Sequence, residues 1–458
     1  MELERLVRRG GPANERAKAK VAAAEAQLLK ARLLYVPRAR FELVYSIVPE
    51  YRCTLPEAFR DVSLSGGGNL YDAMNTRAVR ERFCMGTDNS DTAKDYFRNF
   101  DPRNYYFRFE LNLGQPLYTF GKIRHAKSLA RHGVAAARLA ETQTLDEAVH
   151  GVRRAYFGLK LAREMLFTIE EGEEQLRKAE KRMERALAKE DGETDRTDQY
   201  RLQIARADVD ELTQKVKRGE SMALAGLRAL LGSSAPKGLD IDDRPLDRVK
   251  TELKPLDHYL ALARKHRPEI KLLKVALQAA QTTVKLRKAS FLPDLMLLMR
   301  YRLNLSTSKD DPRNAYLRDE LHGNSVYIGL ALKWDLDFHF KYADLAKAQA
   351  ELVATRHMGE QARLGLELQV ERAHGQLADA LRSLEVLGRA RAAARRWLVT
   401  MGQRHEMGTA STKPLIDALK ARFQADLRYL EAVNSFNMAA VDLSRLVGVE
   451  VASLWETK

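Results

Sequence analysis

The segment LPDLMLLMRYRLNL at residues 292–305 joins the end of one predicted element to the start of another. Every second residue from 295 to 305 is apolar, while Arg300 and Arg302 occupy two of the positions between them. Such alternation predicts a strand with one apolar face and one polar face. The residues before Pro293 are rich in Ala, Gln, Lys and Leu, and proline cannot continue a helix. The segment therefore predicts a switch from helix to strand.

Three further segments alternate with the same period, so that four strands are predicted, at residues 41–47, 107–113, 295–305 and 326–336. Membrane-spanning strands need about 9–11 residues, and in transmembrane barrels apolar residues point outward while polar residues point inward. One such strand alone would fit a soluble, half-buried sheet better. Here each pair of strands lies between long helices, and no other globular core is predicted to cover it. The pattern favours strands that span a membrane.

Four strands are too few to close a barrel, because barrels begin at about eight strands. An open sheet edge is not tolerated in lipid. The barrel must therefore be shared between chains, and three chains would supply twelve strands. The residues alone thus predict an obligate oligomer.

Internal similarity indicates that the chain contains two copies of one unit. Val36-Pro37 and Leu292-Pro293 each end an Ala-rich helical run that is followed by a strand. Two pairs of glycines, each pair 40 residues apart, share an offset of 216: Gly192 with Gly232, and Gly408 with Gly448. A period above 200 residues is too long for a solenoid repeat, so we expect two fused half-domains.

Each copy has the order helix, strand, loop, strand, very long helix, turn and shorter helix. The first copy is expected at residues 1–232, with its β-hairpin at 38–121. The second copy is expected at residues 258–458, with its β-hairpin at 294–340. Residues 233–257 connect the two copies.

The two long helices are expected from about Lys122 to Lys189 and from about Lys341 to Arg404. At 1.5 Å per residue each is roughly 100 Å long, which exceeds a globular core. Apolar residues of the second helix alternate at spacings of four and three: Leu366, Val370, Ala373, Leu377, Ala380, Leu384 and Leu387. This spacing predicts a left-handed antiparallel coiled coil. A soluble coiled-coil structural or scaffold protein is therefore the competing interpretation.

The chain of 458 residues carries 77 Lys and Arg against 62 Asp and Glu, a formal net charge of +15. The basic residues are interleaved with acidic ones along the helices, so a solvated helix face explains them better than nucleic-acid binding. The SGGGN segment at 65–69 lacks the Lys-Ser/Thr of a phosphate loop, and the histidines show no metal-ligand spacing. We expect no enzyme activity, no cofactor and no metal site.

The N-terminus and the cysteines leave the compartment open. No run of 18 apolar residues predicts a membrane-spanning helix, and MELERLVRRGG at 1–11 does not fit a secretory signal as written. The protein is then either cytoplasmic or exported by a signal that this sequence does not contain. Cys53 and Cys84 fall in the long predicted loop at 48–103, where a disulfide and two free thiols are both compatible with the sequence.

The chain resembles the TolC outer-membrane efflux protein family from about residue 14 to residue 450. Besides the internal repeat, the resemblance is carried by LNLGQPLYTFGK at 111–122, RPEIKLLKVALQAA at 267–280, GTASTKPLIDALKARFQADLRYLEA at 408–432 and RLVG at 445–448. The order and spacing of these segments are more specific than any one of them.

The resemblance implies an α+β membrane protein that assembles as a homotrimer. Each chain would contribute four strands to a transmembrane β-barrel, surrounded by the lipid of the bacterial outer membrane. The helices would continue as a periplasmic α-helical barrel, with residues 233–257 in an equatorial layer. Such a channel-tunnel is the exit duct of a tripartite efflux or type I secretion system. Its partners are a periplasmic adaptor (membrane fusion protein) and an inner-membrane pump or ABC transporter.

The resemblance also implies that the helix turns near Gly192 and Gly408 are periplasmic tips, which bind the adaptor and close the tunnel at rest. The tip residues expected to contact the adaptor are Gly192, Thr194, Gly408, Thr409, Ser411 and Leu415.

Family members carry acidic residues that ring the tunnel entrance. Matching outward from the two turn glycines places Asp198 and Asp417 at such positions. A second acidic position of the later turn holds Pro414, a basic gate-linking position holds Ala410, and an aromatic position holds His405. The sequence therefore keeps only part of the gate pattern. Because an Asp in the first turn of a helix also stabilises the helix dipole, a purely structural role for both aspartates stays open.

Overall fold

The computed structural model describes residues 2–47, 105–187, 196–242, 245–307, 322–407, 409 and 411–451. Several predicted features lie outside these described residues, namely the loop with Cys53 and Cys84 and the tip residues Gly192, Thr194 and Gly408. The chain divides into two compact units. The helical unit comprises Met1–Leu28, Ser128–Thr283 and Ala348–Lys458, and the sheet unit comprises Leu29–Lys127 and Val284–Lys347.

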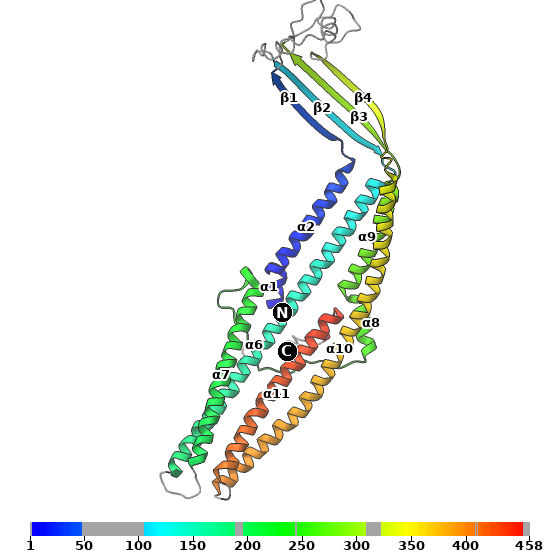
Figure 1. Cartoon of the computed structure of the whole chain (residues 1–458). Coiled ribbons are helices and arrows are strands. Elements are labelled where there is room, and N and C mark those ends of the chain that lie inside the picture. The colour runs from blue at the N-terminus through cyan, green and yellow to red at the C-terminus, as the bar shows by residue number, and fades with distance from the viewer. Residues whose placement is uncertain are drawn as a thin grey trace, which may run out of the picture. The chain divides into compact units, whose positions relative to one another are not determined.

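The sheet unit contains four antiparallel strands in the order β1-β2-β3-β4 (Figure 1). Their bounds are β1 Arg38–Ile47, β2 Tyr105–Tyr118, β3 Asp294–Ser306 and β4 Gly323–Lys333. All four predicted strands are thereby confirmed. The prediction for the end of β4 was wrong, because the strand stops at Lys333 and not at Leu336. Trp334 leaves the ladder instead, and its indole N–H donates to the Phe291 carbonyl over 3.0 Å.

The described α-helices are α1 Glu2–Gly10, α2 Pro12–Arg32, α6 Lys122–Leu187, α7 Arg196–Leu231, α8 Leu256–His266, α9 Pro268–Ala289, α10 Phe338–Glu406 and α11 Thr412–Val447. Short 3-10 turns follow α2 at Leu33–Tyr35 and α7 at Gly232–Ser234. With 66 and 69 residues, α6 and α10 confirm the two very long helices. None of the described helices combines the length and the apolarity that crossing a membrane would require.

Pro37 and Pro293 separate helix from strand, as their chemistry predicts. β1 begins one residue after Pro37, and β3 begins one residue after Pro293. Proline has no backbone N–H for a helix, and it holds the residue before it in an extended conformation. Val36, for example, has φ −75° and ψ 141°.

The short helix α1 is a finding of the structure, because no pattern in the sequence predicted it. Its apolar residues Leu3, Leu6 and Val7 share one face. Val7 is only 1% exposed and packs with Leu227 and Leu231 of α7. Its apolar residues do have helical spacing, but they span little more than one turn of a nine-residue, mostly polar segment.

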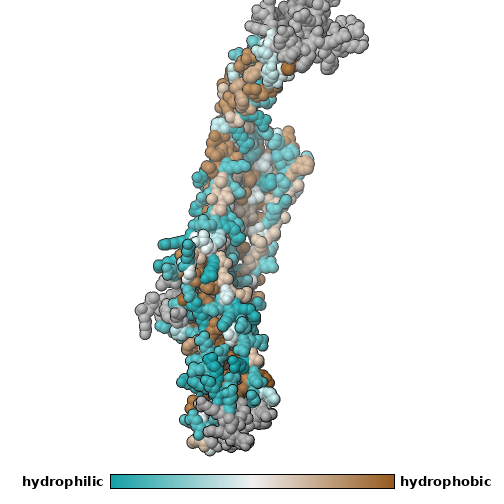
Figure 2. All heavy atoms as spheres, turned by 90° about the vertical axis from the view of Figure 1, so that its left-hand side faces the viewer, coloured by the Kyte–Doolittle hydropathy of each residue, from teal (hydrophilic) through white to brown (hydrophobic). Residues whose placement is uncertain are grey.

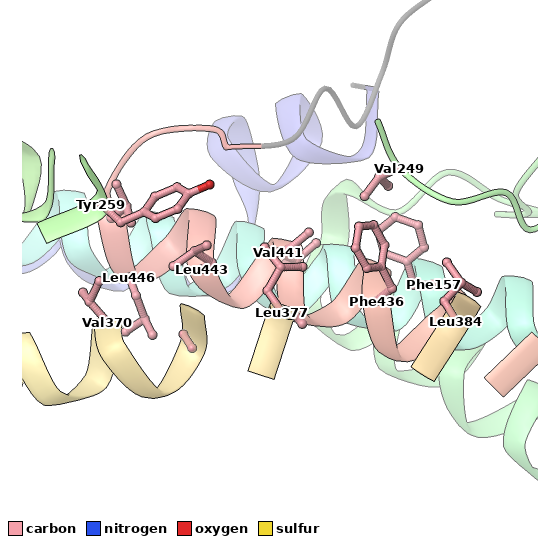
Figure 3. Packing of buried hydrophobic residues seen from close by; sticks show 14 of the residues in the cluster. Phe157, Val249, Tyr259, Val370, Leu377, Leu384, Phe436, Val441, Leu443 and Leu446 are labelled. Atoms are coloured by element: carbon pink, nitrogen blue, oxygen red, sulfur yellow. The ribbon is translucent and has the colours of Figure 1, made fainter. Parts of the chain in front are cut away.

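The main core of the helical unit lies between α10, α11, α8 and the segment that precedes α8 (Figure 3). Its labelled side chains are Phe157, Val249, Tyr259, Val370, Leu377, Leu384, Phe436, Val441, Leu443 and Leu446. Val370 and Leu377 of α10 are fully buried. The predicted apolar row of α10 is thus confirmed as its packing face.

The two shorter return helices correspond closely. α7 and α11 each contain 36 residues, and their first residues, Arg196 and Thr412, are offset by 216 positions. Gly232 follows α7 with φ +56°, and Gly448 follows α11 with φ +79°. Only glycine adopts this left-handed conformation at little cost, which explains why both helices end at a glycine.

Candidate functional site

The turn between α10 and α11 contains two of the predicted tip residues, Thr409 and Ser411. The backbone N–H of Thr409 donates to the Arg404 carbonyl over 2.8 Å, and its hydroxyl donates to the same oxygen over 3.0 Å. Ser411 precedes α11 in an extended conformation, and its hydroxyl makes no capping hydrogen bond. Thr409 and Ser411 are both exposed. The turn therefore presents two hydroxyl side chains to solvent.

The other predicted residues of this tip lie on the adjoining helix ends. His405 is half-buried in the last turn of α10, and Leu415 is half-buried in the first turn of α11. Asp417 is exposed on α11. The structure thus brings these three residues and the turn to one end of the α10–α11 pair. Asp198 lies near the start of α7.

A groove with a volume of about 330 Å³ lies behind this tip, between α6, α7 and α11. Its apolar lining includes Leu176, Ile416 and Phe423, while Asp208 and Lys420 lie at its polar margin. Ile416 is buried against Leu176, and Lys420 Nζ lies 3.7 Å from an Asp208 carboxylate oxygen. The first turns of α11 are therefore attached to the α6–α7 pair by both apolar and ionic contacts.

The sheet has one continuous apolar face, because apolar residues of all four strands lie opposite one another. Phe41 pairs with Leu111, Leu111 pairs with Tyr301, and Tyr301 pairs with Val326. Large apolar side chains of this face are exposed: Phe41, Leu43, Tyr45, Leu297, Leu305, Val326, Ile328, Leu330 and Leu332. Figure 2 shows hydrophobic side chains gathered over the strands. An apolar surface of this extent marks contact with a partner or a membrane.

The opposite face of the sheet is polar and contains linked charged groups. The Glu110 carboxylate on β2 lies 3.1 Å from Arg302 and 3.4 Å from Arg300, both on β3. Arg300 Nε also donates to Asn112 Oδ1 over 2.8 Å. Glu110 is only 13% exposed, whereas Arg300 is 54% exposed. This face therefore directs arginine side chains toward solvent.

Each edge strand of the sheet has one unpaired side in the described part of the chain, since β1 pairs only with β2 and β4 pairs only with β3. Free backbone N–H and C=O groups along an edge strand can bind another strand. The sheet can therefore be extended on both sides.

Sequence reasoning missed a group of ion pairs around the shielded Arg153 of α6. Arg153 Nε donates to Glu4 of α1 over 2.6 Å, and the guanidinium also binds Glu450 near the C-terminus. Burial lowers the pKa of Arg153, but the two carboxylates outweigh burial and raise it above its usual value. The partners are 149 and 297 residues away in the sequence, so no local pattern could have identified them.

A second set of polar contacts attaches the connecting segment to the helices. Arg163 of α6 forms ion pairs with Asp240 and with Glu220 of α7. Buried Asn437 of α11 donates to the Asp247 carbonyl and accepts from the Val249 N–H, each over 2.9 Å. Among the described residues, no group of three or more His, Cys, Asp or Glu side chains is arranged to hold a metal ion.

The chain matches a known family over most of its length. The family model for outer membrane efflux proteins matches residues 84–233 and 259–449. No curated protein matches the sequence.

Solved structures of similar fold include the open state of the Neisseria gonorrhoeae MtrE outer membrane channel, with 17% identity and a TM-score of 0.71 over 98% of this chain and 89% of that one. The Campylobacter jejuni CmeC outer membrane channel matches with 13% identity and a TM-score of 0.70, over 99% and 86% of the two chains. The Vibrio cholerae outer membrane protein VceC matches with 14% identity and a TM-score of 0.71, over 98% and 96%.

Proposed function

Because this chain belongs to the outer membrane efflux protein family, we propose that it forms the outer-membrane exit duct of a tripartite efflux or type I secretion system. The family match confirms the resemblance to TolC-like proteins. The observation that carries the proposal is the two-faced sheet. A soluble sheet would bury its apolar face in a core, whereas Phe41, Ile328 and Leu330 are each more than half exposed. Lipid is the partner that fits such a face.

A homotrimer would resolve the two open edges of the sheet. Three copies supply twelve strands, which is above the minimum of about eight for a closed barrel. Pairing β1 of one copy with β4 of the next would satisfy the free backbone N–H and C=O groups, which have no water to bind inside a bilayer. The helical units would then form the periplasmic extension, with residues 233–257 at its equator. The equal lengths and constant offset of α7 and α11 support an internal duplication into residues 1–232 and 258–458.

Cell fractionation tests this proposal against the competing one, a soluble coiled-coil scaffold. The channel is expected in the outer-membrane fraction, to need detergent for extraction, and to change its gel mobility in SDS on boiling. A protein that is soluble and dimeric without detergent would overturn the proposal.

The tip of the α10–α11 pair is the proposed docking surface for a periplasmic adaptor, and through it for an inner-membrane pump or ABC transporter. The exposed Thr409 and Ser411 and the half-buried Leu415 offer polar and apolar contacts together. Gly192, Thr194 and Gly408 are proposed to complete this surface. Asp198, Asp417 and His405 are proposed to line the tunnel entrance, where carboxylates would attract cations.

Site-specific crosslinking tests the docking surface. A photo-reactive amino acid at Thr409 or Ser411 should form an adduct with a periplasmic adaptor when the protein is expressed in its native cells. The same amino acid at Glu351, which is exposed elsewhere on α10, serves as the control. Adducts from Glu351 but not from the tip would contradict the assignment.

A further inference from the structure

The polar face of the sheet carries an excess of positive charge. Its register places five arginines on this face, Arg38, Arg40, Arg108, Arg300 and Arg302, against two glutamates, Glu42 and Glu110. At the end of β3 and β4, Asp294 and Lys333 lie opposite each other in register and add no net charge to the strands, and the Asp294 carboxylate lies 2.9 Å from Lys122 Nζ. The described strands therefore leave three uncompensated positive charges on this face of each chain.

The excess is concentrated in one row across the sheet. Arg40 on β1, Asn112 on β2, Arg300 on β3 and Tyr327 on β4 lie side by side in register. This row contains two cations and no carboxylate. The adjacent row contains two acids: Glu110 lies 3.1 Å from Arg302 and 3.4 Å from Arg300, and Glu42 lies 4.0 Å from Arg108. The Glu110 carboxylate thus serves two guanidinium groups.

The side chains of this row are open to solvent. Arg40 is exposed, and the Arg300 side chain is 54% exposed while that of Glu110 is 13% exposed. Glu110 is therefore tucked against the sheet and Arg300 extends beyond it, whereas Glu42 on β1 is 53% exposed. A solute that approaches this row meets the guanidinium groups of Arg40 and Arg300, with the exposed Glu42 in the adjacent row.

We propose that the polar face of the sheet is a cationic pore wall that admits anionic solutes in preference to cationic ones. The inference rests on the proposed function, in which this face lines the barrel interior. Three copies would then contribute nine excess positive charges to one ring-shaped wall. Rings of arginine or lysine select anions in pores, and walls of low dielectric constant strengthen such fields. Anionic solutes are the substrate class that this wall fits.

A cysteine reporter measures the potential at this wall without relying on current through the tunnel. Ser325 lies on the polar face, directly opposite Arg302. In the full-length protein with Cys53→Ser and Cys84→Ser, a Ser325→Cys variant is treated with an anionic and with a cationic methanethiosulfonate. Each rate is divided by the rate of the same reagent with 2-mercaptoethanol. The normalised anion-to-cation rate ratio is expected to be about five or more at low salt. It is expected to fall toward one in high salt.

Charge variants give the ratio a predicted direction. Arg40→Gln and Arg300→Gln should lower it, whereas Glu42→Gln, at an exposed acid, should raise it. Arg356→Gln removes one exposed cation from α10 and should leave it unchanged. The arginine variants and Glu42→Gln are expected to shift the ratio in opposite directions, which separates an electrostatic effect from a loss of folding.

Three results would overturn the cationic wall. The first is a ratio near one, and the second is a ratio that does not change in the arginine variants. The third is a Ser325→Cys variant whose new thiol reacts with neither reagent. If the assembly still inserts into membranes as a trimer, the proposed channel function survives that failure. A chain that forms no membrane assembly would overturn both.

Discussion

Gly172 of α6 lies directly against the aromatic ring of Phe423 of α11, because a Cβ atom at position 172 would approach two ring carbons to 2.9 Å. Phe423 belongs to the apolar cluster with Met165 and Ile169 of α6. The missing side chain at Gly172 therefore sets how closely α11 packs against α6 just behind the tip. Any change in this spacing would also change the 330 Å³ groove, which both residues line.

Replacing Gly172 by alanine is expected to lower the thermal unfolding midpoint. Alanine gains about 1 kcal/mol of helix propensity, but overpacking against the Phe423 ring costs about 1–3 kcal/mol. Circular dichroism of the helices measures the outcome. Gly219→Ala on α7 is the matched control, since no atom lies within 4 Å of a Cβ there. That control should match or exceed the wild-type midpoint, and equal behaviour of the two variants would refute the packing argument.

Asn437→Ala is expected to destabilise the fold by about 2 kcal/mol or more. Asn437 is fully buried, and its removal leaves the Val249 N–H and the Asp247 carbonyl without their partner. Each unsatisfied buried group costs about 1–3 kcal/mol. Denaturant unfolding followed by circular dichroism provides the measurement. The exposed residue Gln403 on α10 is the control site, where alanine should have little effect. Similar losses at both positions would show that the buried amide has no special role.

Asp240 should make a small, pH-dependent contribution to stability. The Ile241 backbone N–H and then Arg163 lower the pKa of Asp240. A carboxyl group whose pKa is lower in the folded state stabilises the fold above its unfolded pKa. This contribution is lost as the pH falls through the folded pKa. Because the side chain is 59% exposed, solvent screening holds the contribution below about 1 kcal/mol.

Thermal unfolding of Asp240→Asn across a pH series tests this sign. The variant should melt below the wild type at neutral pH, and the gap should close below about pH 4. Asp210→Asn, at an exposed position of α7, should show no gap at either pH. A gap for Asp240→Asn that persists at low pH would contradict the ionic origin.

Asp417→Asn is expected to change the conductance of the channel or its block by cations in planar bilayers. Asp417 is exposed at the α10–α11 tip, and a ring of three carboxylates would concentrate cations at a narrow entrance. Glu351→Gln removes an exposed carboxylate elsewhere on α10 and should leave conductance unchanged. Identical conductance and identical cation block in Asp417→Asn and wild type would show that Asp417 does not line the entrance. Asp417 lies beyond the first turn of α11, the turn in which a carboxylate would stabilise the helix dipole.

The elements with regular periodicity could be predicted from the sequence. Alternation identified all four strands, and the four-three row of α10 identified Val370 and Leu377 as buried. Both patterns are local, because each residue's environment repeats with its own helix or strand. Pro37 and Pro293 marked the helix-to-strand switches for the same reason.

Contacts between distant segments could not be predicted. Arg153 meets Glu450 across 297 residues, and Asn437 holds a segment about 190 residues earlier. α1 was not predicted because its three apolar residues, although they have helical spacing, span little more than one turn of a mostly polar segment. At the tip, the sequence placed His405, Leu415 and Asp417 near one turn, but only the structure distinguishes the exposed Asp417 from its half-buried neighbours.

The mass of the detergent-extracted assembly tests the proposed shared barrel most directly. Native mass spectrometry of the purified protein, released from detergent, should give three times the chain mass of 52.0 kDa. The three-chain species should depend on detergent or lipid for its solubility. A single-chain mass, or a dimer that is stable in plain buffer, would contradict a twelve-stranded barrel shared between copies.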